Sequence, residues 1–113
     1  MAVTVATSPF FDRWSRSYDN PTLQRLTYRP VHDAVLRCLE RDPPTSVLDL
    51  GCGTGQLTER LTQELPDARI IGLDLSAGML AEAQDRLATT DDRRLVRADA
   101  ERLPFASESF DAI

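Results

Sequence analysis

The sequence predicts an α/β fold in which short parallel strands alternate with helices. Three apolar runs, within residues 46–50, 68–74 and 94–98, are separated by segments with helical periodicity. The first run leads into a turn that carries glycines at positions 51, 53 and 55, and a helical pattern begins directly after it. A strand that enters a helix through glycines is typical of a nucleotide-type cofactor site in a Rossmann-like sheet.

The composition is that of one small globular domain. Of the 113 residues, 42% are hydrophobic and 27% charged, and the net charge is −5. This charge argues against a nucleic-acid partner or an anionic membrane surface. No apolar run approaches the length of a membrane span, and residues 1–9 lack the pattern of a signal peptide. Cys38 and Cys52 fit no zinc-binding spacing, so we expect free thiols, a cytoplasmic location and no metal site.

The first 45 residues are expected to form a helical segment ahead of the sheet. Residues 1–9 predict a loosely tethered start. In residues 10–20, aromatic side chains at positions 10, 11, 14 and 18 would share one helical face, and Asn20-Pro21 would end the helix. Taken alone, this pattern favours a short amphipathic helix that packs its rings on the domain.

A clearer helix is predicted over residues 30–41. Its apolar stripe has the spacing i, i+3, i+4, i+7, i+8 and consists of Val31, Ala34, Val35, Cys38 and Leu39. Cys38 is therefore interpreted as a core residue. His32 lies beside the stripe, and we interpret it as a partly exposed helix residue rather than as a catalytic base.

The second strand ends on an acid that we expect to lie beside the glycine turn. Residues 56–65 predict a helix with Leu57, Leu61 and Leu65 on one face, and residues 68–74 predict the strand that follows. The carboxyl ends of parallel strands meet at one edge of the sheet, which brings Asp74 next to the turn. A carboxylate there can accept two hydrogen bonds from a ribose diol, and the alternative is a plain helix-capping acid.

A further helix and a third strand are predicted next. Ser76 is a good N-cap for a helix whose buried face would consist of Met79, Leu80, Ala83 and Leu87. Met79 is more often a core residue than a ligand contact, yet its place in the first turn would let it touch an adenine. Residues 89–93 predict a polar loop, and residues 94–98 predict a strand that ends at Asp99, a cofactor contact or a turn acid. Residues 109–113 predict the start of a fourth strand.

Three segments in the right order, residues 46–57, 69–80 and 95–113, resemble class I methyltransferases that depend on S-adenosylmethionine (SAM), and a fourth segment at the N-terminus resembles their lid. Read from Asp49, the glycine turn is D-x-G-x-G-x-G and resembles motif I of that family. Residues 99–113, DAERLPFASESFDAI, are similar to its G-D-A-x-x-L-P-F-x-x-x-S-F-D-A-V stretch. Residues 10–20 resemble the F-D-x-x-A-x-x-Y-D opening of its N-terminal lid, with Ser15 where the family often has alanine. The resemblance is strongest to the methyltransferase type 11 group, which includes ubiquinone- and menaquinone-biosynthesis enzymes.

The resemblance implies a fold and a set of cofactor contacts. The family has a seven-stranded sheet of order 3-2-1-4-5-7-6 with helices on both faces. This chain would supply a lid over residues 1–45 and a partial SAM-binding domain over 46–113, truncated after the third strand and the start of the fourth. The implied contacts are Asp49, Gly51, Cys52, Gly53 and Gly55 around the amino-acid end, Asp74 and Leu75 at the ribose, Met79, Asp99 and Ala100 at the adenine, and Tyr18 above the site. The methyl acceptor would be an unidentified small molecule, and no catalytic residue is indicated.

Two other interpretations remain open on the sequence. An NAD-linked oxidoreductase half-domain would share the strand, the turn and the acid after the second strand, but the G-x-G-x-G spacing disfavours it. A non-catalytic or truncated cofactor-binding module is the other. An incompletely paired sheet edge would also expose unpaired backbone groups and apolar surface, both of which favour association. Self-association that completes the sheet is therefore a further expectation.

Overall fold

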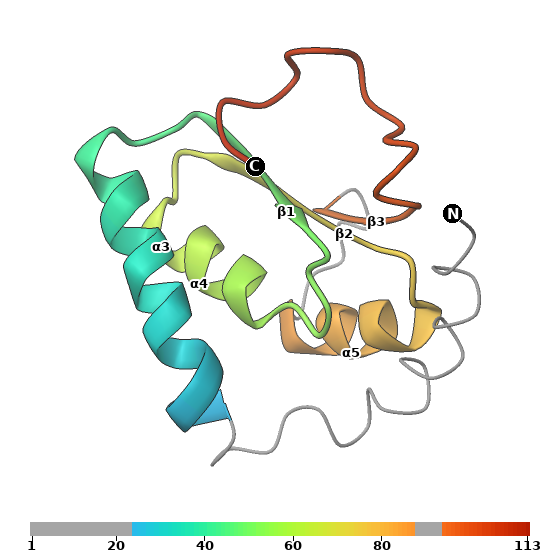
Figure 1. Ribbon diagram of the computed structural model, residues 1–113, viewed down its shortest axis with the longest axis horizontal. Coiled ribbons are helices and arrows are strands. Elements are labelled where there is room, and N and C mark those ends of the chain that lie inside the picture. The colour runs from blue at the N-terminus through green and yellow to red at the C-terminus, as the bar shows by residue number, and fades with distance from the viewer. Residues whose placement is uncertain (1–23, 88–93) are drawn as a thin grey trace.

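The computed structural model describes residues 24–87 and 94–113 (Figure 1). Its elements are the π-helix η1 (Gln24–Tyr28), the α-helices α3 (Arg29–Arg41), α4 (Gln56–Glu64) and α5 (Ala77–Leu87), and the strands β1 (Ser46–Leu50), β2 (Arg69–Asp74) and β3 (Leu95–Arg97). The aromatic segment 10–20 with Tyr18 and the loop 89–93 lie outside the described residues. No helix in the described ranges is long and apolar enough to span a membrane.

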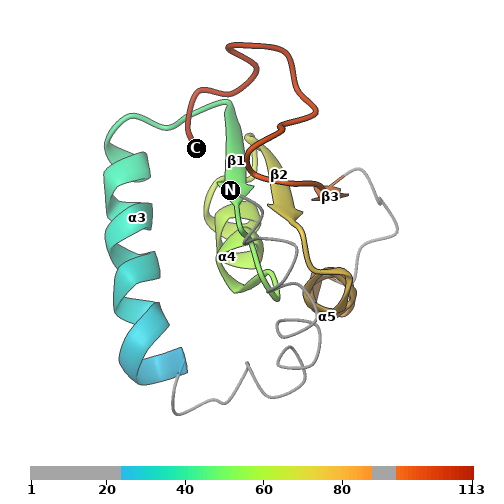
Figure 2. The same cartoon turned by 45° about the vertical axis from the view of Figure 1, so that its right-hand side comes forward.

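The three strands form one parallel sheet of order β1-β2-β3. Ser46 pairs with Arg69 at one end of the β1–β2 ladder and Leu50 with Leu73 at the other. Both crossovers run the same way across the sheet, and the strong preference for right-handed crossovers places α4 and α5 on one face. Figures 1 and 2 show these helices beneath the sheet, with α3 beside α4. The predicted α/β fold is confirmed.

The free side of β1 receives the beginning of a fourth strand. Val47 and Ala112 form a parallel bridge, and the Leu48 N–H donates to the Ala112 carbonyl over 3.0 Å. Thr45 adds a side-chain and a backbone hydrogen bond to the Asp111 carboxylate, at 2.6 and 2.8 Å. The observed strand order therefore extends to 3-2-1-4, as the sequence predicted, although this last pairing is a single bridge.

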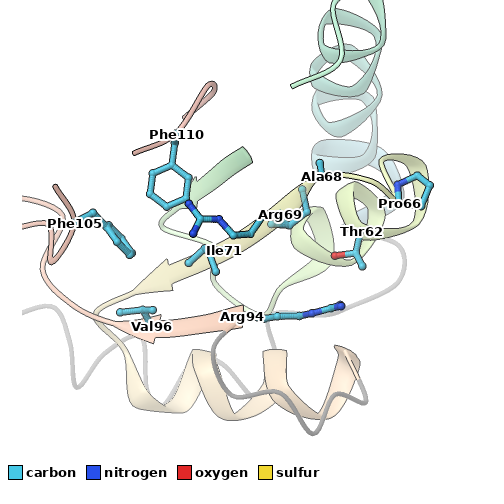
Figure 3. A pocket seen from close by; sticks show the side chains of 10 residues that line it. Thr62, Pro66, Ala68, Arg69, Ile71, Arg94, Val96, Phe105 and Phe110 are labelled. Atoms are coloured by element: carbon cyan, nitrogen blue, oxygen red, sulfur yellow. The ribbon is translucent and has the colours of Figure 1, made fainter. Parts of the chain in front are cut away.

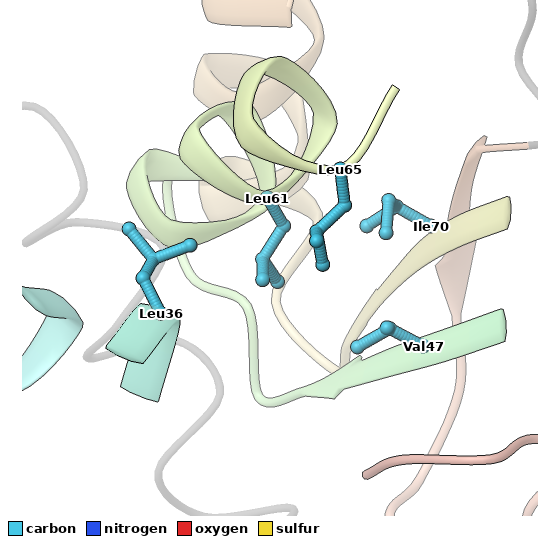
Figure 4. Packing of buried hydrophobic residues seen from close by; sticks show 5 residues of the cluster. All are labelled: Leu36, Val47, Leu61, Leu65 and Ile70. Atoms are coloured by element: carbon cyan, nitrogen blue, oxygen red, sulfur yellow. The ribbon is translucent and has the colours of Figure 1, made fainter. Parts of the chain in front are cut away.

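The core lies between the helical layer and the sheet. Leu61 of α4 and Leu65, the C-cap residue directly after this helix, pack with Leu36 of α3, Val47 of β1 and Ile70 of β2 (Figure 4). Leu61 is only 1% exposed, which confirms the predicted inner face of this helix. Side chains alternate along a strand, so the same face of the sheet also carries Asp49 and Asp74 at the carboxyl ends of β1 and β2.

The helix α3 is rotated relative to the predicted stripe. Val31 is 59% exposed, and Ala34 and Cys38 are exposed as well, so the prediction of a buried Cys38 was wrong. Leu36 is the buried residue instead. It shares a helical face with Tyr28 and His32 at the spacing i, i+4, i+8. Tyr28 and His32 line a cavity beside the glycine turn, while Leu39 of the predicted stripe still packs against the core.

The opposite face of the sheet is covered by the segment that follows β3. The rings of Phe105 and Phe110 meet edge to face with centroids 5.0 Å apart, and the Arg69 guanidinium lies 5.2 Å from the Phe110 ring centroid. Figure 3 shows these side chains around a cavity of about 520 Å³, together with Ile71 and Val96. This cavity lies toward the amino-terminal end of β2, away from the glycine turn.

Candidate functional site

The glycine turn is held against β2 by its backbone. The N–H groups of Gly51 and Cys52 both donate to the Leu73 carbonyl, at 2.7 and 2.9 Å. Gly51, Gly53 and Gly55 have φ values of +73°, +57° and +80°, which L side chains rarely adopt. A Cβ added to Gly51 or Gly53 would meet nothing within 4 Å. The first two glycines therefore present open backbone to any molecule beside the turn.

Gly55 has a different role from the other two glycines. It is the N-cap of α4, and its carbonyl accepts from the Glu59 N–H over 2.9 Å. A Cβ at this position would lie 2.9 Å from the Cβ of Ala83 in α5. Gly55 therefore allows α4 and α5 to approach each other, and its contribution is to packing.

Asp74 connects the glycine turn to the start of α5. One carboxylate oxygen accepts from the Gly53 N–H at 2.8 Å and the other from the Ser76 N–H at 2.9 Å. The Ser76 hydroxyl in turn accepts from the Met79 N–H at 3.1 Å, which confirms Ser76 as the N-cap. A carboxylate offers about four lone-pair positions, so the capping role leaves acceptor positions for a ligand.

Asp49 lies on the same face as Asp74, one strand away. Its carboxylate accepts from the Thr58 hydroxyl of α4 at 2.7 Å. Burial raises the pKa of Asp49, the charge of Asp74 raises it further, and the Thr58 hydrogen bond opposes both effects. The ionised form is thus held at an energetic cost that a cation beside it would relieve.

This cost predicts that Asp49→Asn stabilises the ligand-free protein at neutral pH. The folded-state pKa lies above the unfolded value, so the native state binds more protons, and the stability that this contributes is lost as the pH rises through the folded pKa. Asparagine removes the charge and can still accept from Thr58. Urea unfolding should show that the variant has a higher free energy of unfolding than the unchanged protein at pH 7, and that this difference is smaller at pH 4. An equal or larger gain at pH 4 would contradict this account.

A cavity of about 210 Å³ opens beside the turn. It is lined by Tyr28, His32, Asp49, Gly51, Cys52, Gly53, Thr54, Gln56 and Leu57. Four of the predicted site residues, Asp49, Gly51, Cys52 and Gly53, come together here. The sequence analysis missed the contribution of α3, and the signal that would have revealed it is the spacing of Tyr28, His32 and Leu36.

The remaining predicted contacts lie along the same sheet edge or in the core. The Ala98 N–H donates to the Asp74 carbonyl over 3.1 Å, which places the end of β3 beside Asp74. Asp99 accepts from the Glu101 N–H at 2.9 Å and so shapes its own turn. Ala100 is exposed and Leu75 is half-buried, whereas Met79 is 3% exposed and lies in the core.

His32 is half-buried where α3 faces α4. Burial lowers its pKa, the positive charge of Arg60 lowers it further, and Asp33 opposes the shift. Arg60 and Asp33 form a salt bridge between α4 and α3. The imidazole is therefore neutral at pH 7, with one N–H donor and one acceptor nitrogen.

The described ranges contain no group of three or more acidic, histidine or cysteine side chains that could hold a metal ion.

The two cysteines should differ strongly in reactivity. Burial raises the pKa of Cys52, and the charges of Asp49 and Asp74 raise it further, whereas Cys38 is exposed. Because the thiolate is the reactive form, iodoacetamide at pH 8 is expected to modify Cys38 at least tenfold faster than Cys52. Peptide mass spectrometry measures both rates, and faster modification of Cys52 would contradict the described turn.

Known proteins match the chain in sequence and in fold. The family model described as a methyltransferase domain matches residues 47–113. A malonyl-[acyl-carrier protein] O-methyltransferase of Marinomonas sp. (strain MWYL1) is 40% identical over 104 residues, which are 91% of this chain and 37% of the relative. A trans-aconitate 2-methyltransferase of Methylobacterium nodulans is 51% identical over 59 residues, 52% of this chain and 22% of the relative.

A solved structure gives the same result. The magnesium protoporphyrin IX methyltransferase from Synechocystis PCC 6803, with bound S-adenosylhomocysteine (SAH), superposes with a TM-score of 0.67 at 28% identity, covering 89% of this chain and 52% of that protein. The chain spans little more than a third of the Marinomonas relative. With its parallel sheet and glycine turn, the chain belongs to the family of class I SAM-dependent methyltransferases.

Proposed function

We propose that this chain forms the cofactor-binding part of a SAM-dependent methyltransferase that acts on a small acceptor. The observation that carries the proposal is the open cavity beside the glycine turn, with Asp49 in its wall and Asp74 at the adjoining strand end. SAM is a cation at sulfur and carries an ammonium group, so a site with two neighbouring carboxylates suits it.

Each part of the sheet edge has a proposed role in binding. Asp49 and the open backbone of Gly51 and Gly53 surround the amino-acid end, and the free acceptor positions of Asp74 hold the ribose hydroxyls. Asp99 and Ala100 follow β3 on the adenine side, which is supported by the hydrogen bond from Ala98 to Asp74. Leu75 adds contact at the ribose, while Cys52 and Met79 contribute through packing of the turn and of α5. Tyr18 remains a proposed lid residue from the family resemblance.

The chemistry asks little of the protein beyond position. A methyl group on a sulfonium is already activated, so these residues mainly bind and orient it and exclude water. The relatives named above carry malonyl and trans-aconitate in their names, and both groups contain carboxyl groups. We therefore propose a carboxylate-bearing acceptor, which is already deprotonated at pH 7 and needs no general base.

Two further features of the whole protein are proposals as well. Cys38 and Cys52 are free, which supports a cytoplasmic location. Along the edge of β1, residues 111 and 112 form hydrogen bonds to Ser46 and Leu48 and one β-bridge, and Ile113 beside them is 75% exposed, so we propose that the isolated chain self-associates along the rest of this edge. A monomeric species in sedimentation velocity at high concentration would contradict this second proposal.

The test of the proposed function is calorimetric titration of the purified chain with SAH, with circular dichroism on the same sample. We expect saturable binding of SAH and none of NADH by a chain with helical and strand signal. A folded chain that binds NADH but not SAH would overturn the proposal. Binding of SAH without methyl transfer to any carboxylate acceptor would support the alternative of a non-catalytic cofactor-binding module.

A further inference from the structure

The amino-terminal end of α3 forms one wall of the 210 Å³ cavity. Tyr28, the last residue of η1, and His32, one turn into α3, line it opposite the glycine turn. Leu36, another turn along the same face, is 4% exposed and packs in the core. This buried anchor fixes the rotation of the helix, so Tyr28 and His32 are directed at the turn by the packing of α3.

The order of the strands indicates which end of the proposed ligand lies next to Tyr28 and His32. Asp99 follows β3, Asp74 is the last residue of β2, and Asp49 lies near the carboxyl end of β1, so the three acids have the spatial order of the strands. Figures 1 and 2 show α3 on the β1 side, with its amino-terminal end at the same end of the molecule as the glycine turn. A ligand whose base lies near Asp99 and whose ribose lies near Asp74 therefore extends past Asp49 toward α3.

We propose that Tyr28 and His32 bind the carboxylate of the amino-acid end of SAM, an inference that rests on the proposed function. That end is a zwitterion, with an ammonium and a carboxylate on one carbon atom. Asp49 suits the ammonium, and an acid beside the carboxylate would repel it. The Tyr28 hydroxyl and the imidazole N–H of His32 are uncharged donors on the opposite wall, where the carboxylate would point.

The surroundings of His32 keep it suited to this role. Arg60 of α4 and Asp33 of α3 are the charged groups that act on it, and they are paired with each other. The pair connects the two helices beside His32, so the charge of each group near the imidazole is offset by the other. His32 thus acts as a positioning residue for the cofactor, and no proton transfer is assigned to it.

The experiment compares SAH with 5′-methylthioadenosine, which retains the adenosine and the thioether sulfur and lacks the amino-acid end. We expect His32→Ala to weaken SAH binding about tenfold and Tyr28→Phe by several-fold, the scale of a hydrogen bond to a charged group. Both variants should bind 5′-methylthioadenosine as the unchanged protein does. His32→Gln, which keeps a donor, should recover part of the SAH affinity.

Val31→Ala is the matched control, because Val31 neighbours His32 in the chain but is 59% exposed and does not line the cavity. It should bind both ligands normally. Unchanged SAH affinity in folded His32→Ala and Tyr28→Phe would overturn this inference and leave the proposed function standing. Equal losses for both ligands would also overturn it, since they would show a general effect on the fold. If the unchanged protein binds neither ligand, the proposed function itself fails. If His32→Ala does not fold, the SAH affinities of Tyr28→Phe and His32→Gln test the inference in its place.

Discussion

Replacing Asp74 with alanine is expected to weaken SAH binding by about 1.5–3 kcal/mol, which is roughly tenfold to 150-fold in the dissociation constant. The carboxylate is the acceptor proposed for the ribose hydroxyls, and hydrogen bonds to a charged group have this magnitude. The same carboxylate also accepts from the N–H groups of Gly53 and Ser76. The variant should therefore also lose about 1–3 kcal/mol of folding stability, the cost of leaving partly buried N–H groups without their acceptor.

Ser76→Ala separates the two effects of Asp74. It removes the hydroxyl that caps the Met79 N–H and leaves the Asp74 carboxylate in place. We expect a stability loss of about 1 kcal/mol with SAH affinity unchanged. Calorimetry gives the SAH affinity of each variant, and thermal unfolding gives the stability of each. If Ser76→Ala weakens SAH binding as much as Asp74→Ala does, the carboxylate acts through the shape of the turn, and its ribose role is lost.

Gly55→Ala is expected to produce the largest loss of stability, about 2–5 kcal/mol. The residue has a φ of +80°, and its new Cβ would lie 2.9 Å from the Cβ of Ala83. Left-handed backbone costs an L residue about 1–2 kcal/mol, and overpacking adds about 1–3 kcal/mol. Urea unfolding of the variant and of the unchanged chain measures the difference.

Gly53→Ala is the control for the steric part of this prediction. Gly53 has a φ of +57°, but a Cβ there meets nothing within 4 Å, so only the backbone cost of about 1–2 kcal/mol applies. Because that Cβ would project into the space proposed for the ligand, SAH binding should fall as well. Equal stability losses in the two variants would refute the close contact between the glycine turn and α5.

The parallel sheet and its cofactor edge could be predicted because they depend on local sequence signals. The apolar run before Gly51, the run that ends at Asp74, and Ser76 as a helix cap each specify their own structure, and strand polarity then brings their ends together. The same reasoning anticipated the start of a fourth strand beside β1, although it is observed only as the bridge at Ala112.

The orientation of α3 could not be predicted in this way. Two overlapping stripes exist on that helix, and the more apolar one, with Val31 and Cys38, was preferred. The face that is buried instead contains Leu36 and carries the amphipathic side chains Tyr28 and His32. The choice depends on packing against α4 and on the space beside the glycine turn, which are tertiary effects that helical periodicity alone does not contain. The hydrogen bond from the Gly53 N–H to the Asp74 carboxylate was not predicted for the same reason, whereas a local role of this acid at the start of the next helix was one of the expected alternatives.

The measurement that tests the central claim most directly is a titration of the 15N-labelled chain with SAH, followed by amide NMR. The chain has five glycines, whose amides report on the turn at Gly51 and Gly53 and, for comparison, on Gly78 in α5. The account predicts saturable shifts that are largest at Gly51, Gly53 and His32. Saturable shifts confined to the residues around the larger cavity, such as Arg69 and Phe110, would contradict it and place the ligand on the other face of the sheet.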